Sequence, residues 1–195
     1  MSISTKKELG RARILDAARD VFAEAGLERA SLRAIAARAG YTPAALYFHF
    51  ESREAIYAEL LRGSLADLAA AIARAASGEP RAAFRAGALA LFDFYAARPQ
   101  ELALGLYLGP GGPAPRGLGA EIDPALNAAL LAALAPIRAA AAQLSPEPDA
   151  LVAAAFAQAV GLLVLAETRR LRLFGLAARG VMQRMLEALM EDTPC

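Results

Sequence analysis

One cysteine, one histidine and no tryptophan occur among the 195 residues of this chain. The cysteine is the last residue, Cys195, so an intrachain disulfide and a Cys-x-x-Cys metal site are both excluded, which fits a reducing compartment. A lone histidine, here His49, is seldom a metal ligand or a catalyst. Paired carboxylates and a glycine-rich phosphate loop after a strand are also missing. We therefore expect no catalytic residue, no metal site and no cofactor, and the sequence predicts a protein that is not an enzyme.

An excess of charge of one sign is missing as well, because 21 Lys and Arg face 20 Asp and Glu, for a net charge of +1. Any affinity for nucleic acid must then come from where the cations lie. The most apolar stretch, residues 150–166, is interrupted by Gln158 and is shorter than the roughly 20 residues of a membrane span. Residues 1–7 are polar and lack the apolar core of a signal peptide. We expect a cytoplasmic protein with no membrane segment.

Alanine is abundant, β-branched runs are few and hydrophobic residues make up 57% of the chain, so helices are expected throughout. The length suits a small head on a larger body. Residues 109–119 contain five glycines and three prolines, which exclude a regular element there, Gly26 should end the first helix, and Pro136 should kink or break a helix. Nine helices are predicted, at about residues 5–25, 32–39, 43–47, 52–76, 81–97, 99–108, 124–143, 148–173 and 176–191.

Residues 31–53 contain two short helices around a tight turn. Ser31 can cap the first helix, and Gly40 sits where that helix must end in a left-handed conformation. Thr42 can cap the second helix, and Pro43 occupies its first position, where a missing N–H costs nothing. This arrangement indicates a helix-turn-helix, which places its second helix in the major groove of DNA.

Residues 39–53, Ala-Gly-Tyr-Thr-Pro-Ala-Ala-Leu-Tyr-Phe-His-Phe-Glu-Ser-Arg, closely resemble the recognition segment of the TetR family of bacterial transcriptional regulators. The family pattern reads Ala-Gly-Val-Ser-x-Gly-x-Leu-Tyr-x-His-Phe-x-x-Lys. This chain departs from it at four positions, which are Tyr41, Thr42, Ala44 and Arg53. Tyr41 and Ala44 change the chemistry most, so the operator sequence of a relative cannot be transferred to this chain.

The resemblance implies an all-α, nine-helix TetR-like fold in two functional parts. Residues 1–51 would form the helix-turn-helix DNA-binding domain. Residues 52–195 would form the ligand-binding and dimerisation domain. The match is specific over roughly the first quarter of the chain, whereas the remainder agrees only in length and helical character.

The resemblance also implies DNA contacts. Matching positions predict that Thr42, Tyr47, His49 and Arg53 contact phosphates and that Arg33 reaches a base edge. Each has a local alternative, in which Thr42 only caps, Tyr47 only packs and Arg33 is simply solvated. The cations expected to face phosphates are Lys6, Lys7, Arg11, Arg13, Arg33, Arg38 and Arg53. The predicted DNA-binding set is Arg33, Thr42, Pro43, Ala44, Tyr47, His49, Arg53, Lys6 and Lys7.

The last two predicted helices, Ala150–Leu173 and Leu176–Glu191, are the candidate dimer interface. The first carries small residues at helical spacing, which permit close backbone approach, and the second carries larger apolar residues. A two-fold dimer fits DNA recognition, because one head makes too few contacts for a specific operator. The small residues are Ala150, Ala154, Ala157 and Gly161, and the larger ones are Val181, Met185 and Leu189.

Aromatic and aliphatic residues of the body predict a pocket for a small lipophilic effector, oriented by one or two neutral hydrogen bonds. The alternative is an ordinary packed core, which is the more common role for each residue taken singly. The predicted ligand-binding residues are Leu65, Phe84, Phe92, Tyr95, Leu104, Tyr107, Leu108, Leu130, Phe156 and Gln158.

Together these features predict a ligand-responsive transcriptional regulator. Its partners would be a double-stranded DNA operator, a small lipophilic effector and a second copy of the chain. Repression, relieved when the effector binds, is the default mechanism. The competing hypothesis is an architectural DNA-binding protein without an effector, and the long apolar body with its aromatic-rich fifth helix argues against that hypothesis.

Overall fold

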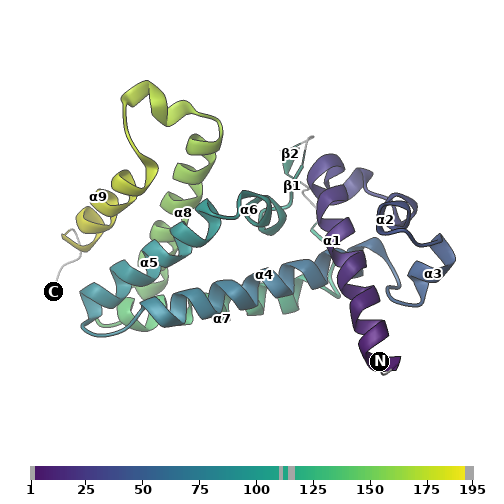
Figure 1. Ribbon diagram of the computed structural model, residues 1–195. Coiled ribbons are helices and arrows are strands. Elements are labelled where there is room, and N and C mark those ends of the chain that lie inside the picture. The colour runs from purple at the N-terminus through teal and green to yellow at the C-terminus, as the bar shows by residue number, and fades with distance from the viewer. Residues whose placement is uncertain (1–2, 110–111, 114–116, 192–195) are drawn as a thin grey trace. The chain divides into compact units, whose positions relative to one another are not determined.

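The computed structural model describes residues 3–109, 112–113 and 117–191, and these ranges are almost entirely helical (Figure 1). The expected all-helical fold with nine α-helices is confirmed for the described residues. The helices are α1 (Ile3–Arg29), α2 (Leu32–Ala39), α3 (Pro43–Tyr47), α4 (Arg53–Ala75), α5 (Pro80–Ala96), α6 (Pro99–Gly105), α7 (Asp123–Ala141), α8 (Pro148–Glu167) and α9 (Ala178–Glu191), with a 3₁₀-helix, η1 (Arg170–Phe174), before α9.

The chain forms two compact units that do not coincide with the boundary predicted after residue 51. The first unit comprises Met1–Ser64 and Gln100–Asn127, and the second comprises Leu65–Pro99 and Ala128–Cys195. Helices α4 and α7 therefore each contribute residues to both units. The boundary predicted after residue 51 concerns the division of functions and not of compact units, and it stays a prediction.

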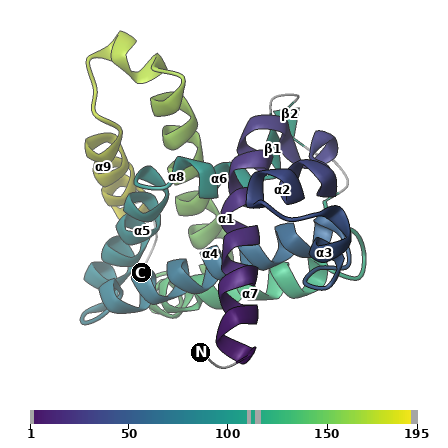
Figure 2. The same cartoon turned by 45° about the vertical axis from the view of Figure 1, so that its right-hand side comes forward.

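The first unit contains a three-helix head. Figure 2 shows α2 lying beside α1 and α3 beside α2, and α1 also packs against the strand β1 (Leu108–Gly109). Ile14, Ile35 and Leu46, one from each helix of the head, are fully buried. Apolar residues at helical spacing on α1 and α2 thus pack, together with Leu46 of α3, into one core that the three helices share.

Helix α1 departs slightly from the sequence prediction at its end. Gly26 leaves the helical conformation as expected, with φ 72° and ψ 169°, but a further helical turn then extends to Arg29. The other caps follow the sequence. Ser31 accepts a 3.1 Å hydrogen bond from the Ala34 N–H, and Gly40 ends α2 in the left-handed conformation, with φ 74°.

The glycine- and proline-rich segment contains a short ribbon, which the sequence did not predict. Leu108–Gly109 pairs antiparallel with β2 (Gly112–Pro113). Glycine and proline prevent a helix there, yet they allow extended backbone, and Gly112 keeps the N–H that a strand ladder needs. The expectation that residues 109–119 hold no regular element was therefore wrong.

Two of the later helices differ from the prediction. Helix α7 continues through Pro136, so the break that the sequence allowed there is absent, because a helix can lose the single hydrogen bond that proline removes when its packing holds it in place; the alternative of a kink stays a prediction. Helix α8 ends at Glu167 rather than at residue 173. Thr168 Oγ1 donates to the Val164 carbonyl oxygen at 2.8 Å, and Arg169 adopts a left-handed conformation with φ 59°, which redirects the chain into η1.

In the second unit, α5 packs against α8 and α9, and α8 packs against α9. Gly87 of α5 allows a close approach, because a β-carbon at this position would lie 2.8 Å from Ile137 Cγ1 of α7. Arg179 of α9 forms a two-pronged ion pair with Asp93 of α5, with contacts of 2.8 and 3.0 Å. These contacts make α5 the central helix of this unit.

Candidate nucleic-acid interface

Helix α3 is short, and its ends are set by its sequence. Thr42 Oγ1 accepts a 3.2 Å hydrogen bond from the Ala45 N–H, and Pro43 is the first helical residue, so the predicted cap is confirmed. Leu46 is fully buried and anchors the helix to the head. The opposite side of α3 is thereby held toward solvent.

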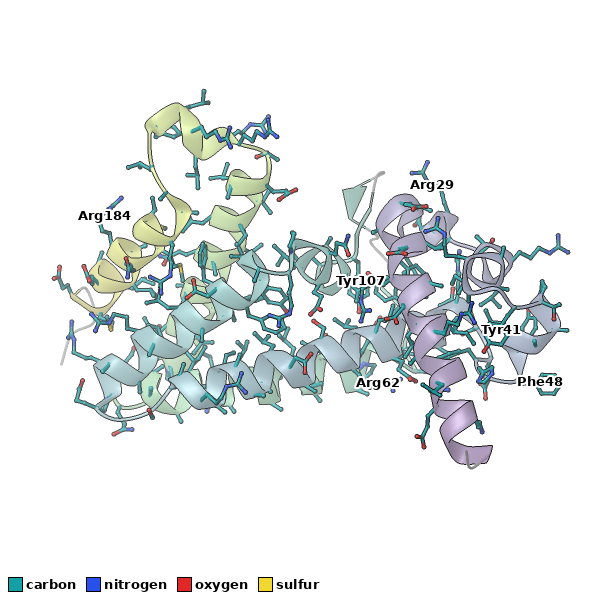
Figure 3. All side chains as sticks on the ribbon, in the orientation of Figure 1. Arg29, Tyr41, Phe48, Arg62, Tyr107 and Arg184 are labelled. Atoms are coloured by element: carbon teal, nitrogen blue, oxygen red, sulfur yellow. The ribbon has the colours of Figure 1, made fainter. Side chains whose placement is uncertain are left out.

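The exposed side of the head contains most of the predicted DNA-binding residues. Arg33 of α2 is exposed, and so are the residues at the start and end of α3, namely Thr42, Pro43, Ala44 and Tyr47. Phe48 is 86% exposed, more than any other large apolar side chain among the described residues, and Figure 3 shows it pointing away from the head. Sequence reasoning missed Phe48, because this residue occupies a position that the family pattern leaves unspecified.

His49 has a more internal position than the other predicted contacts. Its Nδ1 atom is buried and has no hydrogen-bond partner among the described residues, and its ring lies 6.0 Å from the Tyr41 ring in an edge-on arrangement. Arg11 of α1 donates a 2.8 Å hydrogen bond to the His49 carbonyl oxygen. His49 therefore helps to join α1 to the end of α3, and its predicted phosphate contact stays a prediction.

Tyr41, which replaces the family's smaller valine, is accommodated by Gly10. A β-carbon at residue 10 would lie 3.0 Å from Tyr41 Oη and 3.2 Å from His49 Cε1. The absence of a side chain on α1 thus leaves room for the larger residue in the turn.

Three arginines expected to face phosphates have acidic partners within the first unit, and their predicted phosphate contacts stay predictions. Arg11 pairs with Glu59, and its guanidinium lies 4.2 Å from the centre of the Phe50 ring. Arg38 pairs with Glu24 at 2.8 Å, and this hydrogen bond lowers the pKa of the Glu24 carboxyl. Paired cations offer less net charge to DNA than the sequence suggested.

Arg53 is the third of these arginines. It donates to Glu54 at 2.6 Å and to the carbonyl oxygens of Glu28 and Ala30 at 2.7 and 3.1 Å. Burial is the largest single effect and opposes ionisation of Glu54. The hydrogen bond and charge of Arg53, with hydrogen bonds from the backbone and Ser52, together outweigh it and place the pKa of Glu54 below its ordinary value. Arg53 therefore fastens α4 to the junction of α1 and α2, and a DNA phosphate would have to share its guanidinium.

Within the described parts of the chain, Arg33, Lys7 and Arg13 are exposed and form no ion pair. These three cations are the best placed to meet phosphates or base edges without first losing a partner. The side chain of Lys6, also predicted to contact DNA, lies outside the described residues.

The predicted effector residues divide between the two units. Leu104, Tyr107 and Leu108 belong to the first unit, and the side chain of Leu108 lies outside the described residues. Tyr107 donates a 3.3 Å hydrogen bond to Asp123, so its hydroxyl already has a partner. The remaining residues, in the second unit, are Leu65, Phe84, Phe92, Tyr95, Leu130, Phe156 and Gln158.

In the second unit the aromatic residues of α5 are core residues, because Phe84, Phe92 and Tyr95 are each less than 5% exposed. The crevice beside Phe156, between α5, α7 and α8, is too small to admit a water molecule. Gln158 of α8 differs from its neighbours, since its buried Oε1 atom has no hydrogen-bond donor among the described residues. The packed-core alternative therefore describes the aromatic residues, whereas Gln158 retains an unmet acceptor.

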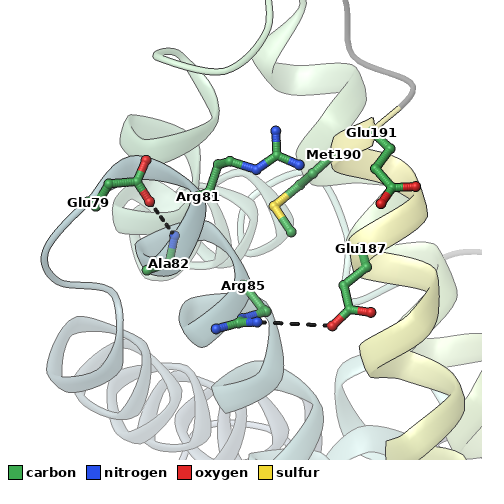
Figure 4. Close-up of a pocket in the computed structure, with 7 residues that line it drawn as sticks. All are labelled: Glu79, Arg81, Ala82, Arg85, Glu187, Met190 and Glu191. Atoms are coloured by element: carbon green, nitrogen blue, oxygen red, sulfur yellow. Dashed lines mark hydrogen bonds and ion pairs between the residues drawn. The ribbon is translucent and has the colours of Figure 1, made fainter.

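A groove of about 250 Å³ lies elsewhere in the second unit, between the start of α5 and the end of α9 (Figure 4). Arg85 and Glu187 approach to 4.0 Å across it. None of the predicted effector residues lines it, and its charges of both signs do not suit a lipophilic ligand. Its lining is Glu79, Arg81, Ala82, Arg85, Glu187, Met190 and Glu191.

Residues 14–60 match the family of bacterial regulatory proteins described as the tetR family. The HTH-type transcriptional repressor KstR2 of Rhodococcus jostii is 47% identical over 58 residues, which cover 30% of this chain and 28% of that protein. The HTH-type transcriptional regulator UidR of Escherichia coli K12 is 38% identical over 73 residues, 37% of this chain and 36% of that protein. The chain therefore aligns with about a third of the length of these relatives.

The fold is shared over a much longer range. The transcriptional regulator FadR of Bacillus subtilis, solved in complex with stearoyl-CoA, superposes with a TM-score of 0.73 over 92% of this chain and 97% of its own. Its sequence identity is 16%, so this likeness concerns the fold alone.

Proposed function

Because this chain belongs to the TetR family of bacterial regulatory proteins, we propose that it binds a DNA operator as a homodimer and that a small lipophilic effector releases it. The observation that carries the proposal is the exposed side of α3, held toward solvent by the buried Leu46. Repression by occlusion of a promoter is the proposed mode of action, and KstR2 is a repressor with a similar head.

DNA binding would combine base contacts with a few unpaired cations. Arg33 is proposed to reach a base edge, while Thr42, Tyr47, His49 and Arg53 contact phosphates together with Lys6 and Lys7. Since the described head holds several of its arginines in ion pairs, we expect a smaller electrostatic contribution than the arginine count suggests.

Dimerisation is proposed through the exposed faces of α8 and α9. Only 33% of the apolar stretch of α8 is buried within the chain, and Ala150, Ala157 and Gly161 lie on its exposed side. Val164 and Leu165 continue that face with exposures of 40% and 38%. A second copy would cover this surface, and two heads would then meet successive half-sites of the operator.

Helices α7 and α8 are long and apolar enough to cross a membrane by composition alone. In this structure α8 packs against α5 and α9, and Ile137 of α7 packs beside Gly87 of α5. A protein partner for the exposed remainder agrees better with a DNA-binding head than a bilayer does, so we propose a cytoplasmic protein.

The effector is proposed to bind in the second unit and to be lipophilic. FadR of Bacillus subtilis, which has the same fold, was solved with stearoyl-CoA, a ligand that carries a long acyl chain. The unmet acceptor on Gln158 would receive one hydrogen bond from the ligand, and the apolar residues around α5 and α8 would open to admit it.

Selection of binding sites from random duplex DNA by the purified full chain tests the proposal. We expect a sequence with two-fold symmetry to be enriched, and lipophilic compounds that raise the melting temperature of the protein should weaken its binding to that sequence. Equal affinity for all duplexes, with no compound that changes it, would instead support the architectural DNA-binding protein.

A further inference from the structure

The surface that α3 offers to DNA is almost free of hydrogen-bonding side chains. The helix contains no charged residue, and Thr42 Oγ1 accepts the N–H of Ala45, so the Thr42 hydroxyl is left with one proton to donate, which the proposed phosphate contact uses. Tyr47 carries the single hydroxyl within the helix. Readout of a guanine or adenine edge needs a bidentate Arg, Lys, Asn or Gln, and α3 has none of these.

Apolar groups occupy the side of α3 that is held toward solvent. Ala44 and Phe48 are four residues apart, and Phe48 has helical backbone angles of φ −68° and ψ −18°, so the two side chains lie on one face of the turn. Both are exposed, and the Phe48 ring is 86% exposed. Removing this phenyl ring from water would be favourable, and that free energy is gained only if a partner covers the ring.

The major-groove edge of a base pair presents one apolar group, which is the C5-methyl group of thymine. We propose that Phe48 determines operator specificity by packing on a thymine methyl group, with the Ala44 methyl group beside it. This inference rests on the proposed function and specifies which chemistry the reading helix recognises. Guanine contacts, where the operator has them, would then come from Arg33 on α2.

The inference predicts sensitivity to one methyl group. Replacing the contacted thymine by deoxyuridine removes only that group, and it should weaken binding by about fourfold, the equivalent of burying one methyl group. A ring that instead rested on deoxyribose or on phosphate would not distinguish thymine from deoxyuridine.

The experiment uses the full chain and the duplex selected above. Each thymine of a half-site is replaced in turn by deoxyuridine, and the dissociation constants of the parent protein and of Phe48→Ala are compared by fluorescence anisotropy. We expect at least one thymine whose replacement weakens the parent about fourfold and leaves Phe48→Ala unchanged. Phe174→Ala is the matched control, because Phe174 is also highly exposed, at 72%, but lies in the second unit.

Phe48→Ala should fold normally, because its side chain contributes little to the core, and an unchanged melting temperature will verify this. The inference is overturned if the parent binds a selected sequence but Phe48→Ala keeps every deoxyuridine effect, or loses affinity equally for thymine and deoxyuridine duplexes. Failure to enrich any sequence would overturn the proposed function itself, which separates the two outcomes.

Discussion

The ring of Tyr57 on α4 stacks on the ring of Tyr107, just beyond α6, with centroids 5.8 Å apart and planes inclined by 12°. Phe22 of α1 also contacts Tyr57, with the two rings edge-on and their centroids 4.9 Å apart. The Tyr57 hydroxyl donates a 2.7 Å hydrogen bond to the carbonyl oxygen of Leu104 in α6. Aromatic contacts therefore join the first helix of the DNA-binding head to α6 within one unit.

Tyr57→Phe should destabilise the first unit. The substitution keeps the ring but leaves the Leu104 carbonyl without its donor, so the free energy of unfolding should fall by about 1–3 kcal/mol. Denaturation by urea, followed by circular dichroism, measures the change. Tyr47→Phe is the control, because the Tyr47 side chain is exposed and its hydroxyl has no hydrogen-bond partner among the described residues. Equal stabilities for Tyr57→Phe and the parent would contradict the role assigned to this bond.

Alkaline pH should weaken the same region. Burial, followed by the charge of Asp123 and the hydrogen bond to it, raises the pKa of Tyr107 to about 12. A phenol in an unfolded chain ionises near pH 10. The stabilisation from the neutral phenol is thus fully present below about pH 10 and is lost as the pH rises toward 12.

Unfolding measured between pH 9 and pH 12 checks this expectation. The parent should lose stability across that window, and Tyr107→Phe should lose less. Absorbance of tyrosinate at alkaline pH should also show that Tyr107→Phe lacks a late-titrating phenol. An identical pH dependence for both proteins would contradict the prediction.

Gly161→Arg should separate the proposed dimer without unfolding the chain. A β-carbon at Gly161 meets no atom within 4 Å, so the side chain has space in the single chain but would block a close helix partner. Analytical ultracentrifugation should show a dimer for the parent and a monomer for the variant. Gly63→Arg is the matched control, because Gly63 is also exposed, helical and without a neighbour within 4 Å. A dimeric Gly161→Arg protein would show that the dimer interface lies elsewhere on the chain.

The two classes of DNA contact should respond differently to salt and to sequence. Tyr47→Phe should weaken binding to all duplexes by a similar factor, whereas Arg33→Ala should also relax the preference at particular base pairs. Arg53→Ala should additionally lower the melting temperature, because it removes the bonds to Glu54, Glu28 and Ala30. Binding titrations at several salt concentrations measure these effects. Unchanged affinity in all three variants would remove this surface as the reading head.

Gln158→Leu should separate a ligand role from a structural one. Removing a buried acceptor without a partner should leave the free protein as stable as the parent or more stable. If Gln158 orients the effector, the same variant should bind that effector more weakly while its operator affinity is unchanged. Thermal shift with and without the compound measures stability and effector binding, and fluorescence anisotropy with the operator duplex measures the operator affinity. Full effector response in Gln158→Leu would exclude this residue from the site.

The sequence predicted the features whose cause is local. Caps at Ser31 and Thr42, and the left-handed end at Gly40, depend on side chains within three or four residues, so the pattern sufficed. The partners of Arg11 and Arg38 are far away along the chain, on α4 and α1, and no local pattern shows them. For that reason the sequence could not show that these cations are paired.

The exposure of Phe48 and the end of α8 could not be predicted from the sequence either. Phe48 is a large apolar residue, a type most often found buried, yet the end of α3 and the buried Leu46 turn it outward. The end of α8 was placed too late because residues 168–173 contain no glycine or proline to mark a helix end, whereas the left-handed Arg169 ends the helix. Long-range packing and backbone conformation decided both cases.

The fit between Gly10 and Tyr41 has an evolutionary consequence. A residue larger than glycine on α1 would press on the tyrosine, whereas a smaller residue in the turn would leave a void beneath α1. Neither position can change freely without the other, although they lie on different elements. In related sequences the two sites should covary, with a larger residue at one accompanied by a smaller residue at the other. Which residues the turn of the reading head can accept therefore depends on which residue α1 already carries at the facing position.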